Sequence, residues 1–178
     1  MSLIESIILG IIQGLTEFLP VSSSGHLEIG KVLLNIELEE SLSFTVMVHF
    51  ATVLSTITVF IREIKILFFD VLKFRWNTST KYFVKILLSM IPVFVVGFFF
   101  QDNVEALFTG NLALVGFALL VTALLLFLTT LVKAEGTKKI PFSDAFVMGI
   151  AQALAVIPGL SRSGSTIATG LLLKNKRD

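Results

Sequence analysis

Three stretches of this sequence contain no Asp, Glu, Lys or Arg: residues 42–61, 86–100 and 111–132. The first and third are long enough to cross about 30 Å of hydrocarbon as helices. The second reaches that length if Lys85 extends its ammonium group to the interface. The whole chain is 54% hydrophobic and 15% charged, whereas soluble domains carry about 25% charged residues. The pattern predicts an all-α polytopic membrane protein with transmembrane helices at about 42–61, 82–100 and 111–132.

Composition also excludes some classes of protein. The chain has no cysteine, so it has neither a disulfide framework nor a thiolate metal site. Its formal charge of +1 gives no indication of nucleic-acid binding, and we expect none. The N-terminus lacks the basic segment and small-residue cleavage site of a signal peptide.

The charges of the connecting segments predict an orientation. Segment 62–81 carries five basic and two acidic residues, and segment 133–142 carries three basic residues and one acidic residue. Segment 101–110 contains two acidic residues and no basic one. Because basic connections remain in the cytoplasm, we expect 62–81 and 133–142 on the cytoplasmic side and 101–110 outside. The acidic segment 37–41 then also lies outside.

A segment of the chain recurs at a fixed interval. Residues 8–27 align with residues 147–166 at a shift of 139 without a gap, and seven of the twenty positions are identical. Average composition predicts roughly one or two identities. Each copy begins as an apolar helix pattern and ends in a Ser/Gly-rich turn. This predicts two re-entrant hairpins, each with a turn at membrane depth that protein or a watery cavity must satisfy.

The interval divides the chain into repeats. Residues 1–138 would form a first repeat, with a hairpin at about 3–36 followed by the three transmembrane helices. Residues 139–178 would begin a second repeat with its own hairpin. Three spans is an odd number, so the second repeat must have inverted topology and the two turns can meet inside the membrane. A complete second repeat would extend to about residue 278, so we expect a fragment, a truncated reading frame or a degenerate copy.

The two turns carry complementary polar side chains. The first copy supplies Gln13, Glu17, Ser22, Ser23, Ser24, Gly25 and His26, and the second supplies Ser161, Arg162, Ser163, Gly164 and Thr166. Backbone N–H groups and hydroxyls in such turns can surround an anion. Arginine binds phosphate oxygens in a fork, and ions within a membrane are usually functional. An acid/base pair, hydroxyl nucleophiles, an anion clamp and a carboxylate able to hold a divalent metal predict phosphoryl chemistry on a lipid-borne substrate.

Each of these residues also has a purely structural interpretation. The serines could be helix N-caps, Glu17 could be the ion-pair partner of Arg162, and His26 could be an interfacial histidine. His49 lies among apolar residues in the predicted 42–61 helix, where we expect it to make a helix-packing hydrogen bond.

Two segments resemble the signature motifs of the undecaprenyl-pyrophosphate phosphatase family, the bacitracin-resistance type of integral membrane phosphatase: QGLTEFLPVSSSGHL and PGLSRSGST. The resemblance implies hydrolysis of undecaprenyl pyrophosphate to the monophosphate, which recycles the carrier lipid of cell-wall synthesis. It also implies dependence on a divalent cation such as Mg²⁺ or Ca²⁺, and an active site open to the outer side of the cell membrane. Carried onto this chain, it implies catalytic roles for Glu17, Ser23, His26 and Arg162. The acidic motif includes Gln13 and Glu17 as candidate metal ligands.

A different class of function is also compatible with the sequence. Broken helices of inverted repeats that meet at the midplane are typical of transporters, so a lipid-phosphate transporter or flippase is the alternative, and an inert remnant is a third. A carrier needs an anion clamp but no acid/base pair, and the combination of Glu, Ser, His and Arg favours an enzyme. The sequence leaves open whether Ser23 or His26 attacks the phosphorus or activates water.

Overall fold

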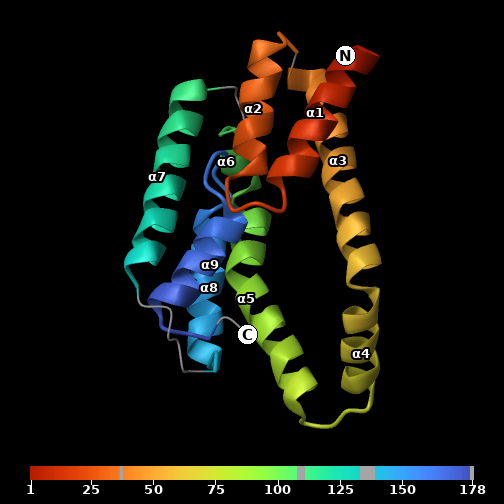
Figure 1. Cartoon of the computed structure of the whole chain (residues 1–178), viewed down its shortest axis with the longest axis vertical. Helices are drawn as coiled ribbons and strands as arrows, with labels where there is room; N and C mark the ends of the chain where they lie inside the picture. The colour runs from red at the N-terminus through yellow and green to blue at the C-terminus, as the bar shows by residue number, and fades with distance from the viewer. Residues whose placement is uncertain (37, 108–110, 133–138, 177–178) are drawn as a thin grey trace.

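The computed structural model describes residues 1–36, 38–107, 111–132 and 139–176. Nine helices follow one another in these residues (Figure 1). They are α1 (Leu3–Thr16), α2 (Ser23–Leu33), α3 (Leu38–Val59), α4 (Ile61–Leu72), α5 (Thr78–Phe99), α6 (Gln101–Glu105), α7 (Leu112–Leu131), α8 (Phe142–Leu154) and α9 (Arg162–Leu172). The all-helical fold agrees with the class predicted from the sequence.

Two helices, α5 and α7, are long and apolar enough to cross a membrane. Helices α3 and α4 meet that criterion only as a pair, which is bent by 78° at the break between them. By length and composition, the described residues therefore contain two or three membrane-crossing helices. The predicted spans at 82–100 and 111–132 correspond to α5 and α7, and the predicted span at 42–61 corresponds to α3.

The predicted connection at 62–81 is not a simple loop, because it contains α4. Apolar side chains recur at helical spacing in this segment, at Ile61, Ile64 and Phe68, and all three are exposed. The charges in the segment determined its expected side of the membrane, but this apolar periodicity is what makes it helical.

Parts of the other predicted connections lie outside the described residues: Glu37, residues 108–110 and residues 133–138, as do residues 177–178 at the end of the predicted second repeat. The boundary predicted between residues 138 and 139 lies at the edge of one of these gaps. The division into two repeats at that point therefore stays a prediction.

The repeated sequence segments form two helical hairpins, α1–α2 and α8–α9. Their first helices begin 139 residues apart, at Leu3 and Phe142, and their second helices also begin 139 residues apart, at Ser23 and Arg162. The second helices end at the same interval. The offset found in the sequence is therefore also the offset between the helix boundaries.

Both second helices have the same start and stop signals. Ser22 and Ser161 are the N-caps, and each hydroxyl accepts a hydrogen bond from the backbone N–H three residues later, at 3.3 Å and 3.0 Å. Both helices are followed by a left-handed residue, Asn35 with φ 52° and Lys174 with φ 59°. In each case the N–H groups of the left-handed residue and of the residue after it donate to carbonyls of the last turn, which is the Schellman motif.

The two hairpins point in opposite directions, and their turns meet near the middle of the molecule (Figure 1). A Cβ added to Gly25 would lie 2.8 Å from the Cα of Gly159. Gly159 itself has φ 92°, and a Cβ there would approach the backbone oxygen of Val115. Glycine is required at both positions because one backbone packs directly against the other. Helix α7 contacts both α2 and α9, beside this junction.

One ion pair is buried within α2. Lys31 Nζ lies 2.9 Å from Glu28 Oε1, and both side chains are almost inaccessible to solvent. Removing one partner of such a pair leaves the other charge buried and costs about 3–5 kcal/mol. Neither residue lines the cavity described below, so the pair is a structural part of the first hairpin.

The buried apolar residues are mostly small. They are Leu9, Leu27, Val115, Ala118, Ala145, Ala155 and Ala168. Small residues allow helices in membranes to approach closely. The closest approach joins α5 and α8, where a Cβ on Gly149 would overlap the backbone carbonyl of Ser89.

We predict that Gly149→Ala forces α5 and α8 apart and lowers the free energy of unfolding by about 1–3 kcal/mol. Gly116→Ala in α7 is the matched control, because a Cβ there meets nothing within 4 Å. The control should be neutral or stabilising by roughly 0.5–1 kcal/mol, since alanine favours the helix. Denaturant unfolding in detergent measures both, and equal stability of the two variants would contradict the packing described for Gly149.

Candidate functional site

A cavity of about 500 Å³ lies between the two hairpin turns and α3. Its polar lining comprises Glu17, Ser22, Ser23, Ser24, Thr45, His49, Gln152, Ser161, Arg162, Ser163 and Thr166, and its apolar lining comprises Leu19, Ala155, Val156, Leu160 and Ile167. The structure thus gathers most of the predicted site residues around one space. Four predicted site residues do not line this cavity: Gln13, Gly25, His26 and Gly164.

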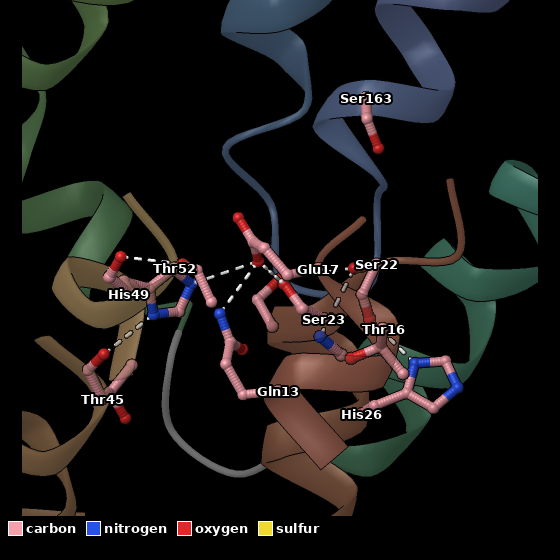
Figure 2. A network of polar contacts seen from close by, with 12 residues as sticks. Gln13, Thr16, Glu17, Ser22, Ser23, His26, Thr45, His49, Thr52 and Ser163 are labelled. Carbon is pink, nitrogen blue, oxygen red and sulfur yellow. Dashed lines mark hydrogen bonds and ion pairs between the residues drawn. The ribbon is translucent and has the colours of Figure 1, made fainter. Parts of the chain in front are cut away.

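Glu17 is the centre of the polar network on the α1 side of the cavity (Figure 2). It follows the last residue of α1, and its Oε2 accepts a hydrogen bond from Gln13 Nε2 at 2.9 Å. The hydroxyl of Ser23 donates a second, short hydrogen bond to the same oxygen. A serine hydroxyl held by a carboxylate is the arrangement in which a base can take the proton of a nucleophile.

His26 lies on the other side of the serine turn from Gln13 and His49 (Figure 2). Its Nδ1 is 2.8 Å from the backbone oxygen of Ser22. A carbonyl oxygen only accepts, so Nδ1 is the donor in this contact. The structure does not bring the His26 ring into the cavity with Glu17. Its catalytic role stays a prediction.

His49 is the residue for which the structure differs most from expectation. We expected a hydrogen bond between helices, but Nδ1 bonds within α3 to the backbone oxygen of Thr45, at 2.8 Å. Its Nε2 faces the cavity, 3.9 Å from Glu17 Oε2. The sequence held one signal of this: Thr45, His49 and Thr52 recur at helical spacing and form a polar stripe on one face of α3. The polar stripe can be recognised in the sequence, but the sequence does not show that it faces Glu17 at the end of α1.

The second turn is held in place by Thr122 of α7. The Thr122 hydroxyl donates to the backbone oxygen of Gly159 and accepts from the N–H of Ser161, both at 3.0 Å. Thr122 is buried, so these two bonds are protected from water. Helix α9 begins immediately after Ser161, and Thr122 therefore fixes where its N-terminus lies.

Arg162 lies at this N-terminus, and its side chain is exposed to the cavity. In the part of the chain that the structure describes, its guanidinium makes no ion pair or hydrogen bond. The alternative that Glu17 is its structural partner is thus not what the structure contains. A free guanidinium beside a helix N-terminus can bind an anion.

The acidic motif fits a hard divalent cation only through Glu17. No cluster of three or more His, Asp or Glu side chains suitable for a metal occurs among the described residues. Mg²⁺ nevertheless often uses one or two carboxylates, with water and substrate phosphates completing its shell. Glu17 Oε1 is available for this, since the hydrogen bonds of the carboxylate go to Oε2. Gln13 presents its nitrogen to Glu17, and its buried Oε1 has no partner within the described part.

The apolar helices α5 and α7 and the polar cavity between the two helical hairpins and α3 define an integral membrane protein with an internal site. The chain belongs to the family described as bacitracin resistance protein BacA, whose profile matches residues 6–178. This confirms the resemblance inferred from the two motifs.

Curated relatives of this chain carry the name undecaprenyl-diphosphatase. The one from Christiangramia forsetii is 53% identical, over 99% of this chain and 67% of the relative. The one from Parabacteroides distasonis is 56% identical, over 99% of this chain and 66% of the relative. A more distant relative from Methanococcus vannielii is 38% identical over 98% of this chain and 69% of its own length. The chain spans about two thirds of the length of these relatives.

We predict that Thr122→Val, which keeps the shape and removes the hydroxyl, lowers the free energy of unfolding by about 1–3 kcal/mol because it leaves buried polar groups unpaired. The amide hydrogen of Ser161 should also exchange faster with solvent. Thr122→Ser retains the hydroxyl, so the amide hydrogen of Ser161 should exchange at close to the wild-type rate. If the valine and serine variants behave alike, Thr122 does not hold the turn.

Proposed function

We propose that this chain carries the site of an undecaprenyl-diphosphatase, which hydrolyses undecaprenyl pyrophosphate to undecaprenyl phosphate and phosphate. The observation that carries the proposal is the hydrogen bond from the Ser23 hydroxyl to the Glu17 carboxylate, in a cavity that also contains the Arg162 guanidinium, which has no partner among the described residues. The names of the relatives support the substrate class. The enzyme would recycle the lipid carrier of cell-wall synthesis, which fits bacitracin resistance as the name of the family.

The anion would bind at the second turn. Arg162 would grip phosphate oxygens in a fork, and the N-terminus of α9 would add its partial positive charge. The hydroxyl of Ser163 lines the same wall and offers a further donor, whereas the Thr166 hydroxyl already donates to the backbone oxygen of Arg162 at 2.7 Å. His49 Nε2, which faces Glu17 from α3, completes the ring of polar groups around the terminal phosphate.

The reaction would proceed through serine. Glu17 takes the proton of Ser23 as Oγ attacks the terminal phosphorus, and the bond to the bridging oxygen breaks so that undecaprenyl phosphate leaves. Water then hydrolyses the phosphoserine, which restores the hydroxyl and releases phosphate. The geometry favours Ser23 over His26 as the nucleophile, because His26 does not line the cavity.

A divalent cation, Mg²⁺ or Ca²⁺, would be held at Glu17 Oε1 and would neutralise part of the pyrophosphate charge when bound. Gln13 would contribute by orienting the carboxylate through its 2.9 Å hydrogen bond rather than as a ligand. Its amide nitrogen has no lone pair to offer a metal.

We further propose that the hairpins are re-entrant and belong to repeats of inverted topology in the plasma membrane. Their equal offset, matching caps and opposite directions support this. The basic residues of segment 62–81 would place the α4–α5 end in the cytoplasm, and the cavity would open toward the outer side. A lipid-phosphate carrier would need the anion clamp but not the contact between Ser23 and Glu17, and the relatives' names do not favour it.

Ser23→Ala should lower kcat for phosphate release from undecaprenyl pyrophosphate by about 10³-fold or more while KM changes little, because the nucleophile is lost and the anion clamp remains. Ser24→Ala is the matched control, since Ser24 lines the cavity but does not contact Glu17. It should retain most of the turnover. Acid-quenched enzyme should contain phosphoserine at position 23, and a phosphohistidine at position 26 would instead identify His26 as the nucleophile.

Arg162→Ala and Arg162→Lys should both raise KM and lower kcat/KM by about 10²-fold or more, because a point charge does not replace a bidentate fork. Lys139→Gln changes a described basic residue remote from the cavity lining and serves as the control for net charge. Steady-state kinetics in detergent with a fixed excess of Mg²⁺ compare the variants. Full activity of the Arg162→Lys variant would exclude bidentate binding of the phosphate by Arg162.

A further inference from the structure

The turn between α4 and α5, residues 73–77, presents aromatic side chains to the outside. Phe74 is 92% exposed and Trp76 is 63% exposed. Phe74 also has φ 50°, a conformation that is uncommon for a bulky residue. The turn lies at one end of the molecule, at the start of the membrane-crossing helix α5 (Figure 1).

Hydrogen bonds hold this turn in shape. Asp70 accepts from Lys73 Nζ at 2.8 Å through one carboxylate oxygen and from Ser79 Oγ at 2.9 Å through the other. The Thr80 hydroxyl donates to the backbone oxygen of Arg75 at 2.7 Å. Residues from both helices thus tie the turn together. The exposed aromatics are held in place by a structured turn.

The same segment concentrates positive charge. Five basic and two acidic residues give segment 62–81 a formal charge of +3, whereas the whole chain has +1. One of the two acids, Asp70, is already paired with Lys73. Lys65, Arg75 and Lys81 are exposed, and their side chains make no ion pair or hydrogen bond within the described residues. Their charge is therefore available to a partner.

We propose that the α4–α5 turn is an interfacial anchor that binds the headgroups of anionic phospholipids. Tryptophan and other aromatic residues prefer the level of the headgroups, and clusters of four to eight basic residues beside a transmembrane helix attract anionic lipids. Phe68, Phe69 and Leu72 of α4 are also exposed and continue the apolar surface toward the bilayer. Aromatics and cations together on one rigid turn fit a lipid surface, with rings at the interface and charges on the phosphates.

The chain contains a single tryptophan, Trp76, so tryptophan emission excited selectively reports on this turn alone. The full chain is reconstituted in vesicles of phosphatidylcholine alone or of phosphatidylcholine mixed with phosphatidylglycerol. In the mixed vesicles, either the phosphatidylcholine or the phosphatidylglycerol carries brominated chains, which quench the emission of a nearby tryptophan. We expect blue-shifted emission and a preference for quenching by brominated phosphatidylglycerol of roughly fivefold or more, the factor that one basic residue near an anionic surface supplies. The preference should fall as salt is added.

Two variants separate charge from structure. The triple variant Lys65→Gln, Arg75→Gln and Lys81→Gln leaves the pair between Lys73 and Asp70 intact and should lose the preference for the anionic lipid. The control replaces three described lysines elsewhere, Lys139, Lys174 and Lys176, with Gln, and should keep it. Equal quenching by both lipids in the wild type, or a preference that survives in the first variant, would overturn headgroup binding. Trp76 emission at the wavelength of a water-exposed tryptophan in both kinds of vesicle would overturn the anchor itself. A blue shift that occurs only after a second protein is added to the vesicles would also overturn it.

Discussion

The backbone contact between Gly25 and Gly159 determines how far apart the two halves of the site lie. With side chains at either position the hairpin turns would separate, and Ser23 and Arg162 would no longer line one cavity. The contact also dictates what surrounds it. The carbonyl of Gly159 and the N–H of Ser161 are buried, and Thr122 satisfies both with one hydroxyl. A membrane protein needs such internal partners because the bilayer offers no others.

The polar groups of the first hairpin also need hydrogen-bond partners inside the protein, but here not every buried polar atom has one. Gln13 is almost fully buried and uses its nitrogen on Glu17, whereas its Oε1 is left without a partner in the described part of the chain. Glu28 and Lys31 pair with each other on one helix through Glu28 Oε1, and Glu28 Oε2 likewise has no hydrogen-bond partner in the described part. The Glu17 carboxylate, in contrast to that of Glu28, stays partly accessible to solvent. Burial therefore separates a structural acid on α2 from the acid that can take part in chemistry.

Much of the fold could be predicted from the sequence because its signals are local. Charge-free stretches marked α3, α5 and α7, and the repeat located both hairpins to within a few residues. Over helix α4, charge alone predicts a connection, whereas the apolar periodicity indicates a helix. The site was predicted in composition but not in geometry: Glu17, Ser23 and Arg162 line one cavity, while the ring of His26 lies outside it. His49 was missed as a cavity residue because no pattern within one helix reveals which helix it will face.

Each hairpin carries its own caps, from the N-cap serine of its second helix to the left-handed residue that ends it. The backbone of each copy therefore does not depend on the residues that differ between them, such as Ser23 and its counterpart Arg162, or His26 and its counterpart Ser165. One ancestral unit could thus duplicate and diverge, with a serine at this position in one copy and an arginine in the other. The two copies resemble subunits of a homodimer that share a single chain, and their covalent connection lets equivalent positions carry different residues.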